Sequence, residues 1–121
     1  MIKPVVTMLL LSSLIGCSSL TPKDLRGSTP DAVHSSVKPP KQIALCIADV
    51  WENTNLFGGS VGVNMRETSF GYTVSMNFSG HLTYLADIST TSTGSATKLF
   101  KGRGISLGED PTVSAVTNCQ L

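Results

Sequence analysis

The chain has 121 residues, of which 40% are hydrophobic and 14% are charged, and its formal net charge is +1. This length suits one compact domain rather than two. The near-zero net charge provides no basic surface for nucleic acid, and the balance of apolar and charged residues argues against a wholly disordered chain.

An apolar run occupies the N-terminus. A single positive charge, Lys3, precedes about a dozen mostly apolar residues, and the small residue Gly16 closes the run, which is the layout of a secretory signal peptide. The run is too short to span a bilayer comfortably, because a spanning helix needs roughly 20 residues. A buried helix is the alternative, but the run has no polar face. We therefore expect residues 1–16 to be removed as a signal peptide.

The run ends in the sequence LIGC, which consists of Leu14, Ile15, Gly16 and Cys17. This sequence resembles the lipobox of bacterial lipoproteins, an aliphatic residue, a tolerated second residue and a small residue before a cysteine. The resemblance implies that the Cys17 thiol receives a diacylglycerol and that cleavage makes Cys17 the first residue. Its amine can then be acylated, and more than one acyl chain makes a stable membrane anchor. The alternative is a coincidental cysteine after a conventional signal peptide.

Ser18 follows the lipidated position. In the sorting rule of enterobacterial lipoproteins, an aspartate at this position retains the protein in the inner membrane. The resemblance therefore implies an anchor in the outer membrane, with the domain facing the periplasm. In a host with a different sorting rule, the inner membrane is the alternative location. In a Gram-positive host, the anchor would lie on the outer face of the only membrane.

Residues 17–40 contain the lipidated cysteine followed by a stretch rich in Ser, Thr, Pro and Lys. Such a composition buries little apolar surface and predicts a flexible tether. The short segment Ala32-Val33-His34 can instead dock on the domain as an edge strand. We expect the folded periplasmic domain to cover residues 41–121.

The start of that domain, KQIALCIADVWEN, has helical periodicity. Its apolar residues recur at i, i+3, i+4, i+7 and i+8 and form one stripe. They are Ile43, Cys46, Ile47, Val50 and Trp51. Pro39-Pro40 lies just upstream, where proline is tolerated at a helix start. The pattern predicts an amphipathic helix.

The middle of the domain alternates between apolar and polar residues, which predicts antiparallel strands with one buried face. The apolar positions are Val61, Val63 and Met65, then Phe70, Tyr72, Val74, Met76 and Phe78, then Leu82, Tyr84, Ala86 and Ile88. Ser79-Gly80 predicts a turn. The polar residues 89–95 predict a loop, and a fourth strand with poor alternation is expected at residues 96–101.

The final segment, EDPTVSAVTNCQL, predicts a short helix with Asp110 as N-cap and Pro111 at the first helical position. The expected fold is α+β: an N-terminal helix, an antiparallel sheet of about three to four strands and a short C-terminal helix, with both helices on one face. A small barrel is the main alternative.

The three cysteines divide into one anchor and one pair. With Cys17 assigned to the lipid, Cys46 and Cys119 remain, one in each predicted helix. An exported domain lies in an oxidising compartment, so we expect a disulfide that joins the first helix to the last. Closing a loop of about 74 residues would stabilise the fold by roughly 4 kcal/mol in the chain-entropy model. Two free buried thiols are the alternative.

No arrangement of residues predicts catalysis or metal binding. Ser79, His81 and Asp87 are the residue types of a hydrolytic triad, but their closeness in sequence does not establish its geometry. His34 and His81 lack the ligand spacing of a zinc site. We expect no catalytic residue, no metal and no cofactor besides the lipid on Cys17. Lys98, Lys101 and Arg103 form a basic turn that could contact anionic lipid headgroups or an acidic partner, although solvated loop charges are the default.

These patterns favour a non-enzymatic envelope lipoprotein that presents its domain to another envelope protein. The alternative is an inhibitor or ligand-binding module. Small lipoproteins that inhibit lysozyme are also β-rich and disulfide-bonded, and Ser79-Gly80 with Tyr84 is similar to their inhibitory loop, although the two predicted helices depart from their barrel fold. A wall hydrolase is a third, weaker hypothesis, and no nucleic-acid partner is expected.

Overall fold

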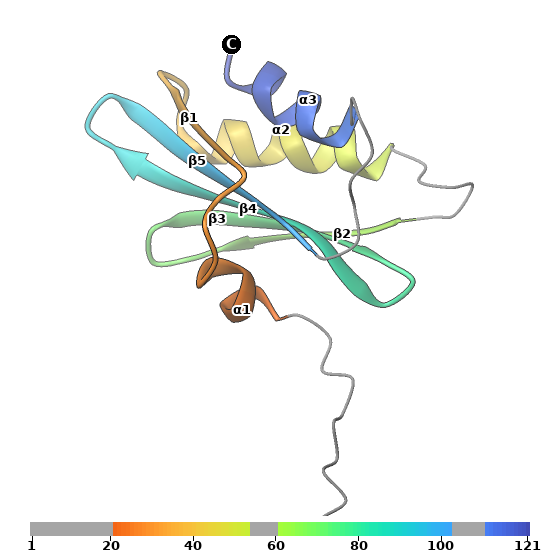
Figure 1. Cartoon of the computed structure of the whole chain (residues 1–121). Helices are drawn as coiled ribbons and strands as arrows, with labels where there is room; N and C mark the ends of the chain where they lie inside the picture. The colour runs from red at the N-terminus through yellow and green to blue at the C-terminus, as the bar shows by residue number, and fades with distance from the viewer. Residues whose placement is uncertain (1–20, 54–60, 103–110) are drawn as a thin grey trace, which may run out of the picture.

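Five antiparallel strands form one open sheet in the part of the chain that the computed structural model describes, residues 21–53, 61–102 and 111–121. The spatial order of the strands is β1-β5-β4-β3-β2 (Figure 1). The elements along the chain are α1 (Pro22–Arg26), β1 (Ala32–Ser36), α2 (Pro40–Glu52), β2 (Val61–Glu67), β3 (Gly71–Phe78), β4 (His81–Thr91), β5 (Gly94–Lys101) and α3 (Pro111–Cys119). The α+β class is confirmed, with more strands than expected.

The segment expected as a tether contributes two of these elements. Thr21 caps α1 with a complete capping box, since its hydroxyl accepts from the Asp24 backbone N–H and the Asp24 carboxylate accepts from the Thr21 backbone N–H. Strand β1 pairs with β5 at the edge of the sheet, as the edge-strand alternative for Ala32-Val33-His34 predicted. The described fold therefore starts about twenty residues earlier than residue 41.

Strands β2 to β5 follow one another as antiparallel hairpins. The predicted turn at Ser79-Gly80 joins β3 to β4, and both residues have positive φ. The loop predicted at residues 89–95 is wrong, because β4 continues to Thr91 and β5 begins at Gly94. Ser and Thr pair across this hairpin, and threonine suits a strand even where the sequence is too polar to show an apolar face.

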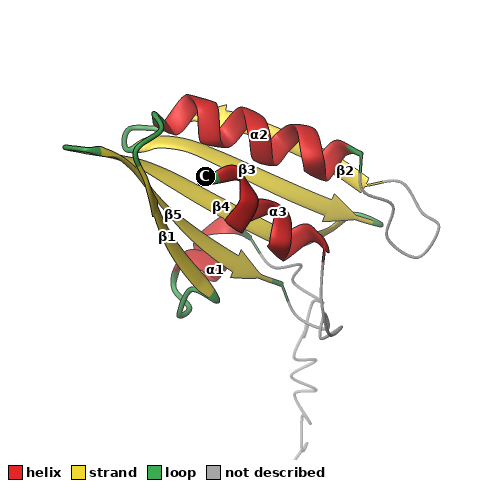
Figure 2. Cartoon of the chain, turned by 90° about the horizontal axis from the view of Figure 1, so that it is seen from above, coloured by secondary structure: helices red, strands yellow, loops and turns green. Residues whose placement is uncertain are grey.

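Helices α2 and α3 cover one face of the sheet, and the short α1 lies on the other (Figures 1 and 2). The buried stripe of α2 contains Ile43, Ile47 and Trp51, as its periodicity predicted, whereas Val50 is 40% exposed. Buried residues of both helices and of β3, β4 and β5 form one core. The expected N-cap Asp110 lies outside the described residues.

The opposite side of the sheet, here called the α1-side face, has a smaller apolar cluster. Leu25 of α1 packs there against Leu82, Leu85 and Phe100. Because successive side chains of a strand point to opposite faces, the strand neighbours Tyr84, Ala86 and Leu99 belong to the main core. Helix α1 covers only part of this face, since its backbone lies closest to β4 and β5.

Candidate functional site

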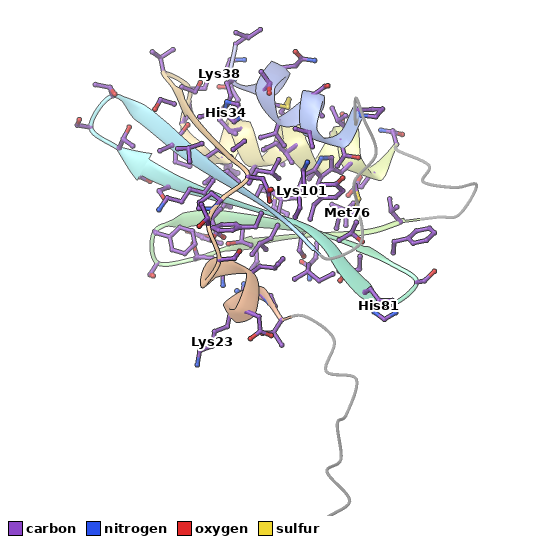
Figure 3. The ribbon with its side chains drawn as sticks, in the orientation of Figure 1. Lys23, His34, Lys38, Met76, His81 and Lys101 are labelled. Carbon is purple, nitrogen blue, oxygen red and sulfur yellow. A yellow bond between two sulfur atoms is a disulfide. The ribbon has the colours of Figure 1, made fainter. Side chains whose placement is uncertain are left out.

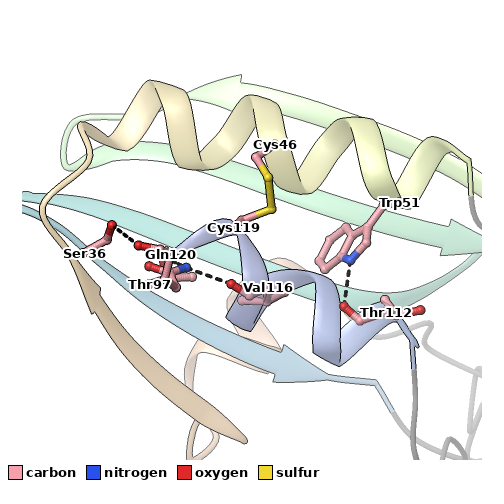
Figure 4. The surroundings of a disulfide bond; sticks show 8 residues. All are labelled: Ser36, Cys46, Trp51, Thr97, Thr112, Val116, Cys119 and Gln120. Carbon is pink, nitrogen blue, oxygen red and sulfur yellow. Dashed lines mark hydrogen bonds between the residues drawn. A yellow bond between two sulfur atoms is a disulfide. The ribbon is translucent and has the colours of Figure 1, made fainter.

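The disulfide between Cys46 and Cys119 joins α2 to α3, which confirms the predicted bond (Figure 4). The two Cα atoms are 5.8 Å apart across 73 positions of sequence. At the other end of α3, the Trp51 indole Nε1–H donates to the Thr112 carbonyl at 3.1 Å. Helix α3 is therefore attached to α2 near both of its ends.

The C-terminus also contacts the edge strand β1 (Figure 4). The Ser36 hydroxyl donates to the Gln120 carbonyl at 2.7 Å. The Gln120 side-chain amide donates to the Thr97 hydroxyl and to the Val116 carbonyl. His34 is directly opposite Thr97 in the sheet, and its Nε2 is buried without a hydrogen-bond partner in the structure. These contacts hold β1 in place and provide no reactive arrangement.

The lipobox residues Leu14, Ile15, Gly16 and Cys17 lie outside the described part of the chain. The first described residue, Thr21, is only four positions after Cys17. Among the described residues, no helix is long and apolar enough to cross a bilayer.

The residue types of a hydrolytic triad do not come together. His81 is exposed at the start of β4, whereas Asp87 is six positions further along the same strand, which corresponds to about 20 Å. His34 and His81 lie in different parts of the molecule (Figure 3). In the described ranges, no group of three or more His, Cys, Asp or Glu side chains is placed to hold a metal ion.

Asp87 is instead part of a polar network on the α1-side face. Its carboxylate accepts two hydrogen bonds from the Arg26 guanidinium, at 2.7 Å from Nε and 3.0 Å from Nη2. The Thr73 hydroxyl donates to the same carboxylate at 2.7 Å and accepts from Arg26 at 3.0 Å. The hydrogen bonds that Arg26 donates to the Asp87 carboxylate raise the pKa of the Arg26 guanidinium above its ordinary value. The Phe70 ring lies under this guanidinium, 5.9 Å from centroid to Cζ.

The network belongs to a row of residues that are neighbours across the whole sheet. From β1 to β2, the cross-strand pairing places Val33, Lys98, Asp87, Thr73 and Arg66 side by side. Directly opposed residues of antiparallel strands share a face, so all five side chains are on the α1-side face. Lys101 is shifted by three positions from Lys98 and belongs to the other face, and Arg103 lies outside the described residues.

A shallow hollow of about 130 Å³ lies beside α1, over the part of this face that the helix leaves uncovered. Its lining residues are Pro22, Asn64, Arg66, Thr73, Ser75 and Leu85. Asn64 and Arg66 are exposed, whereas Thr73 is buried. The Thr73 hydroxyl already donates to Asp87, so the hydrogen-bond donors at this space are the Arg66 guanidinium and the side chains of Asn64 and Ser75.

No local sequence pattern joins the residues of this site. Arg26 and Asp87 are 61 positions apart in the sequence. Arg26 also lies in residues 17–40, whose composition predicted a flexible tether. The capping-box spacing of Thr21 and Asp24 indicates that a helix starts there. It does not indicate which part of the chain the helix packs against. No family model, curated protein or solved structure matches the chain.

Proposed function

We propose that the protein is a non-enzymatic envelope lipoprotein, anchored through Cys17 at the periplasmic face of the outer membrane, whose domain binds another envelope protein. The observation that carries this proposal is the sequence LIGC, from Leu14 to Cys17, at the end of an N-terminal apolar run. The disulfide between Cys46 and Cys119 supports it, because such bonds persist in oxidising compartments.

The mass of the intact protein extracted from membranes tests the anchor. We expect a chain that begins at Cys17 and has the added mass of a diacylglycerol, with or without an acyl group on the amine. The Cys17→Ser variant is expected to lose this mass and to leave the membrane fraction on washing. Membrane association that survives in this variant would contradict the lipid anchor.

The binding role is tested by crosslinking in cells. Leu45 and Val50 are 51% and 40% exposed on α2, so photo-crosslinking residues at these two positions sample the helical side of the domain. Asn64 on β2 provides an exposed position on the opposite side of the sheet. We expect a reproducible protein adduct identified by mass spectrometry. The absence of an adduct at all three positions would contradict the interaction hypothesis.

The second candidate is a ligand-binding or inhibitor module, and the hollow beside α1 is the observation in its favour. The specific similarity to lysozyme inhibitors is weakened, because Tyr84 is fully buried and its ring lies 6.0 Å from that of Trp51. Tyr84 is therefore not exposed beside Ser79-Gly80. Stoichiometric inhibition of lysozyme by the purified protein would favour this candidate over the first.

A further inference from the structure

The chain between the proposed anchor and the domain is too short to let the domain turn freely. Four positions separate Cys17 from Thr21, so these Cα atoms can be at most about 14 Å apart at roughly 3.5 Å per residue. Thr21 caps α1, and Leu25 and Arg26 attach α1 to the α1-side face. The acyl chains therefore leave the molecule on the side of the sheet where α1 lies.

The other side of the sheet is further away than this reach. Helices α1 and α2 lie on opposite faces (Figures 1 and 2). A packed helix and its sheet have centres about 10 Å apart, so the two helices are separated by about 20 Å. A connection of about 14 Å from α1 is shorter than this separation and cannot bring the outer side of α2 flat against the bilayer.

The charges on the two sides also differ. Arg66 and Lys98 are exposed on the α1-side face, and Lys23 projects from α1 away from the sheet (Figure 3). In the described part of the chain, the one salt bridge is Arg26–Asp87, so none of these three cations is neutralised by a carboxylate contact.

Besides Asp87, the nearby carboxylates are Asp24 and Asp31, which keep their negative charge and are outnumbered by Lys23, Arg66 and Lys98. Asp24 accepts the Thr21 backbone N–H in the capping box, and Asp31 accepts the backbone N–H of Lys101. On the exposed side of α2, Lys41 is opposed by two acidic residues, Asp49 and Glu52. With Lys38 just before α2, the outer side of this helix has no net positive charge, so an anionic surface attracts the α1-side face more strongly.

Exposed apolar side chains do not distinguish the two sides. Val33 and Phe70 lie on or beside the α1-side face, and Leu45 and Val50 lie on α2.

The hollow beside α1 does distinguish the two sides of the sheet. Its guanidinium, amide and hydroxyl groups are the donors that bind phosphate oxygens, and the charged donor Arg66 is exposed.

We propose that the α1-side face lies against the anionic phospholipid surface in which Cys17 is anchored, with Arg66 and Lys98 contacting lipid phosphates. This inference rests on the proposed lipidation of Cys17. Its consequence is that α2 and α3 face away from the membrane and form the side of the domain that a protein partner reaches first.

The orientation is measured on the full lipidated protein in vesicles of phosphatidylethanolamine with about one third phosphatidylglycerol. Acylated Cys17 and the Cys46–Cys119 disulfide leave no native thiol, so one introduced cysteine takes a fluorophore specifically. Asn64→Cys places the label on the α1-side face, and Gln42→Cys places it on the exposed side of α2. We expect a nitroxide-headgroup lipid to quench the label at position 64 at least threefold more strongly than the label at position 42.

Matched charge variants test the phosphate contacts. Arg66→Gln combined with Lys98→Gln is expected to reduce this quenching ratio at least twofold, and so is an increase of the salt concentration to 1 M, where the Debye length falls to about 3 Å. Lys41→Gln removes a cation from α2 and is expected to leave the ratio unchanged. Circular dichroism of each variant shows that the fold is retained.

The mass of the same samples separates the two proposals. Equal or reversed quenching in protein with acylated Cys17 would overturn the orientation and leave the lipoprotein proposal intact. Protein without acylation would overturn the lipoprotein proposal and the orientation with it. Unchanged quenching in the Arg66 and Lys98 double variant would overturn the phosphate contacts.

Discussion

The Nε atom of Arg26 lies 2.7 Å from Oδ2 of Asp87, and this pair attaches the first helix of the described domain to a central strand of the sheet. The Arg26 and Asp87 side chains are 30% and 11% exposed, so solvent screens the pair only in part. The pair explains how a helix of five residues with a single buried apolar side chain has a defined position.

We expect Arg26→Ala to lower the free energy of unfolding by about 1–3 kcal/mol, because the variant leaves the Asp87 carboxylate largely buried without its charged partner. Asp87→Asn is expected to have a similar cost. The double variant should lose less than the sum of the two, with a coupling energy of about 0.5–3 kcal/mol from urea unfolding. Lys23→Ala, on the exposed side of the same helix, should change stability by less than about 0.5 kcal/mol. Strictly additive losses would contradict a coupled pair.

Removal of the disulfide should have a larger effect. The Cys46→Ala, Cys119→Ala double variant is expected to lose about 4 kcal/mol of unfolding free energy, since the unfolded chain regains the entropy of a loop of about 74 residues. A reducing agent should destabilise the native protein by a similar amount and leave the double variant unaffected. A double variant that reduction destabilises further would show that the bond is not the source of the difference.

Trp51 is the single tryptophan of the chain and is fully buried. Its native emission is therefore expected at short wavelength, shifting to longer wavelength as urea unfolds the domain. Trp51→Phe removes the hydrogen bond to the Thr112 carbonyl as well as ring volume, and should cost about 1–3 kcal/mol by circular dichroism. A native spectrum typical of exposed indole would contradict the packing of α2 on the sheet.

Gly94 is required where the β4–β5 hairpin meets the end of β1. Its φ is +151°, and a Cβ there would meet the Ser36 carbonyl oxygen and would lie 2.6 Å from the Val37 carbonyl carbon. Gly94→Ala should therefore cost at least about 2 kcal/mol, since backbone must move. Gly62→Ala is the matched control, because the nearest atom to its Cβ is 3.9 Å away. Equal effects of the two substitutions would be inconsistent with this contact.

The capping box of α1 predicts a response to acid. The hydrogen bond from the Thr21 backbone N–H lowers the pKa of the Asp24 carboxyl below its ordinary value of 3.8. A depressed pKa in the folded state means that the contribution is present above pH 3.8 and is lost as the pH falls through the folded pKa. NMR titration should show the Thr21 amide shifting with a midpoint below pH 3.8, and Asp24→Asn should abolish the shift. A midpoint above pH 3.8 would contradict the box.

The sequence alone was sufficient where one short segment contains its own pattern. Ile43, Ile47 and Trp51 repeat with the helical period, so the buried side of α2 follows from local spacing. Alternation predicted β2, β3 and β4 in the same way. The disulfide was predicted by counting, since the expected lipidation of Cys17 left two cysteines and both lie in predicted helices.

Two elements, α1 and β1, depend on tertiary contacts because their own segments bury little apolar surface. Helix α1 has five residues and β1 has five, and each is stabilised by partners far along the chain: Asp87 for Arg26, and β5 for β1. A short helix is marginal by itself, and an edge strand needs only a neighbour that offers hydrogen bonds. Composition therefore predicted a tether for both segments, because the sheet edge of β5 and the Asp87 carboxylate are brought next to them only by the tertiary fold.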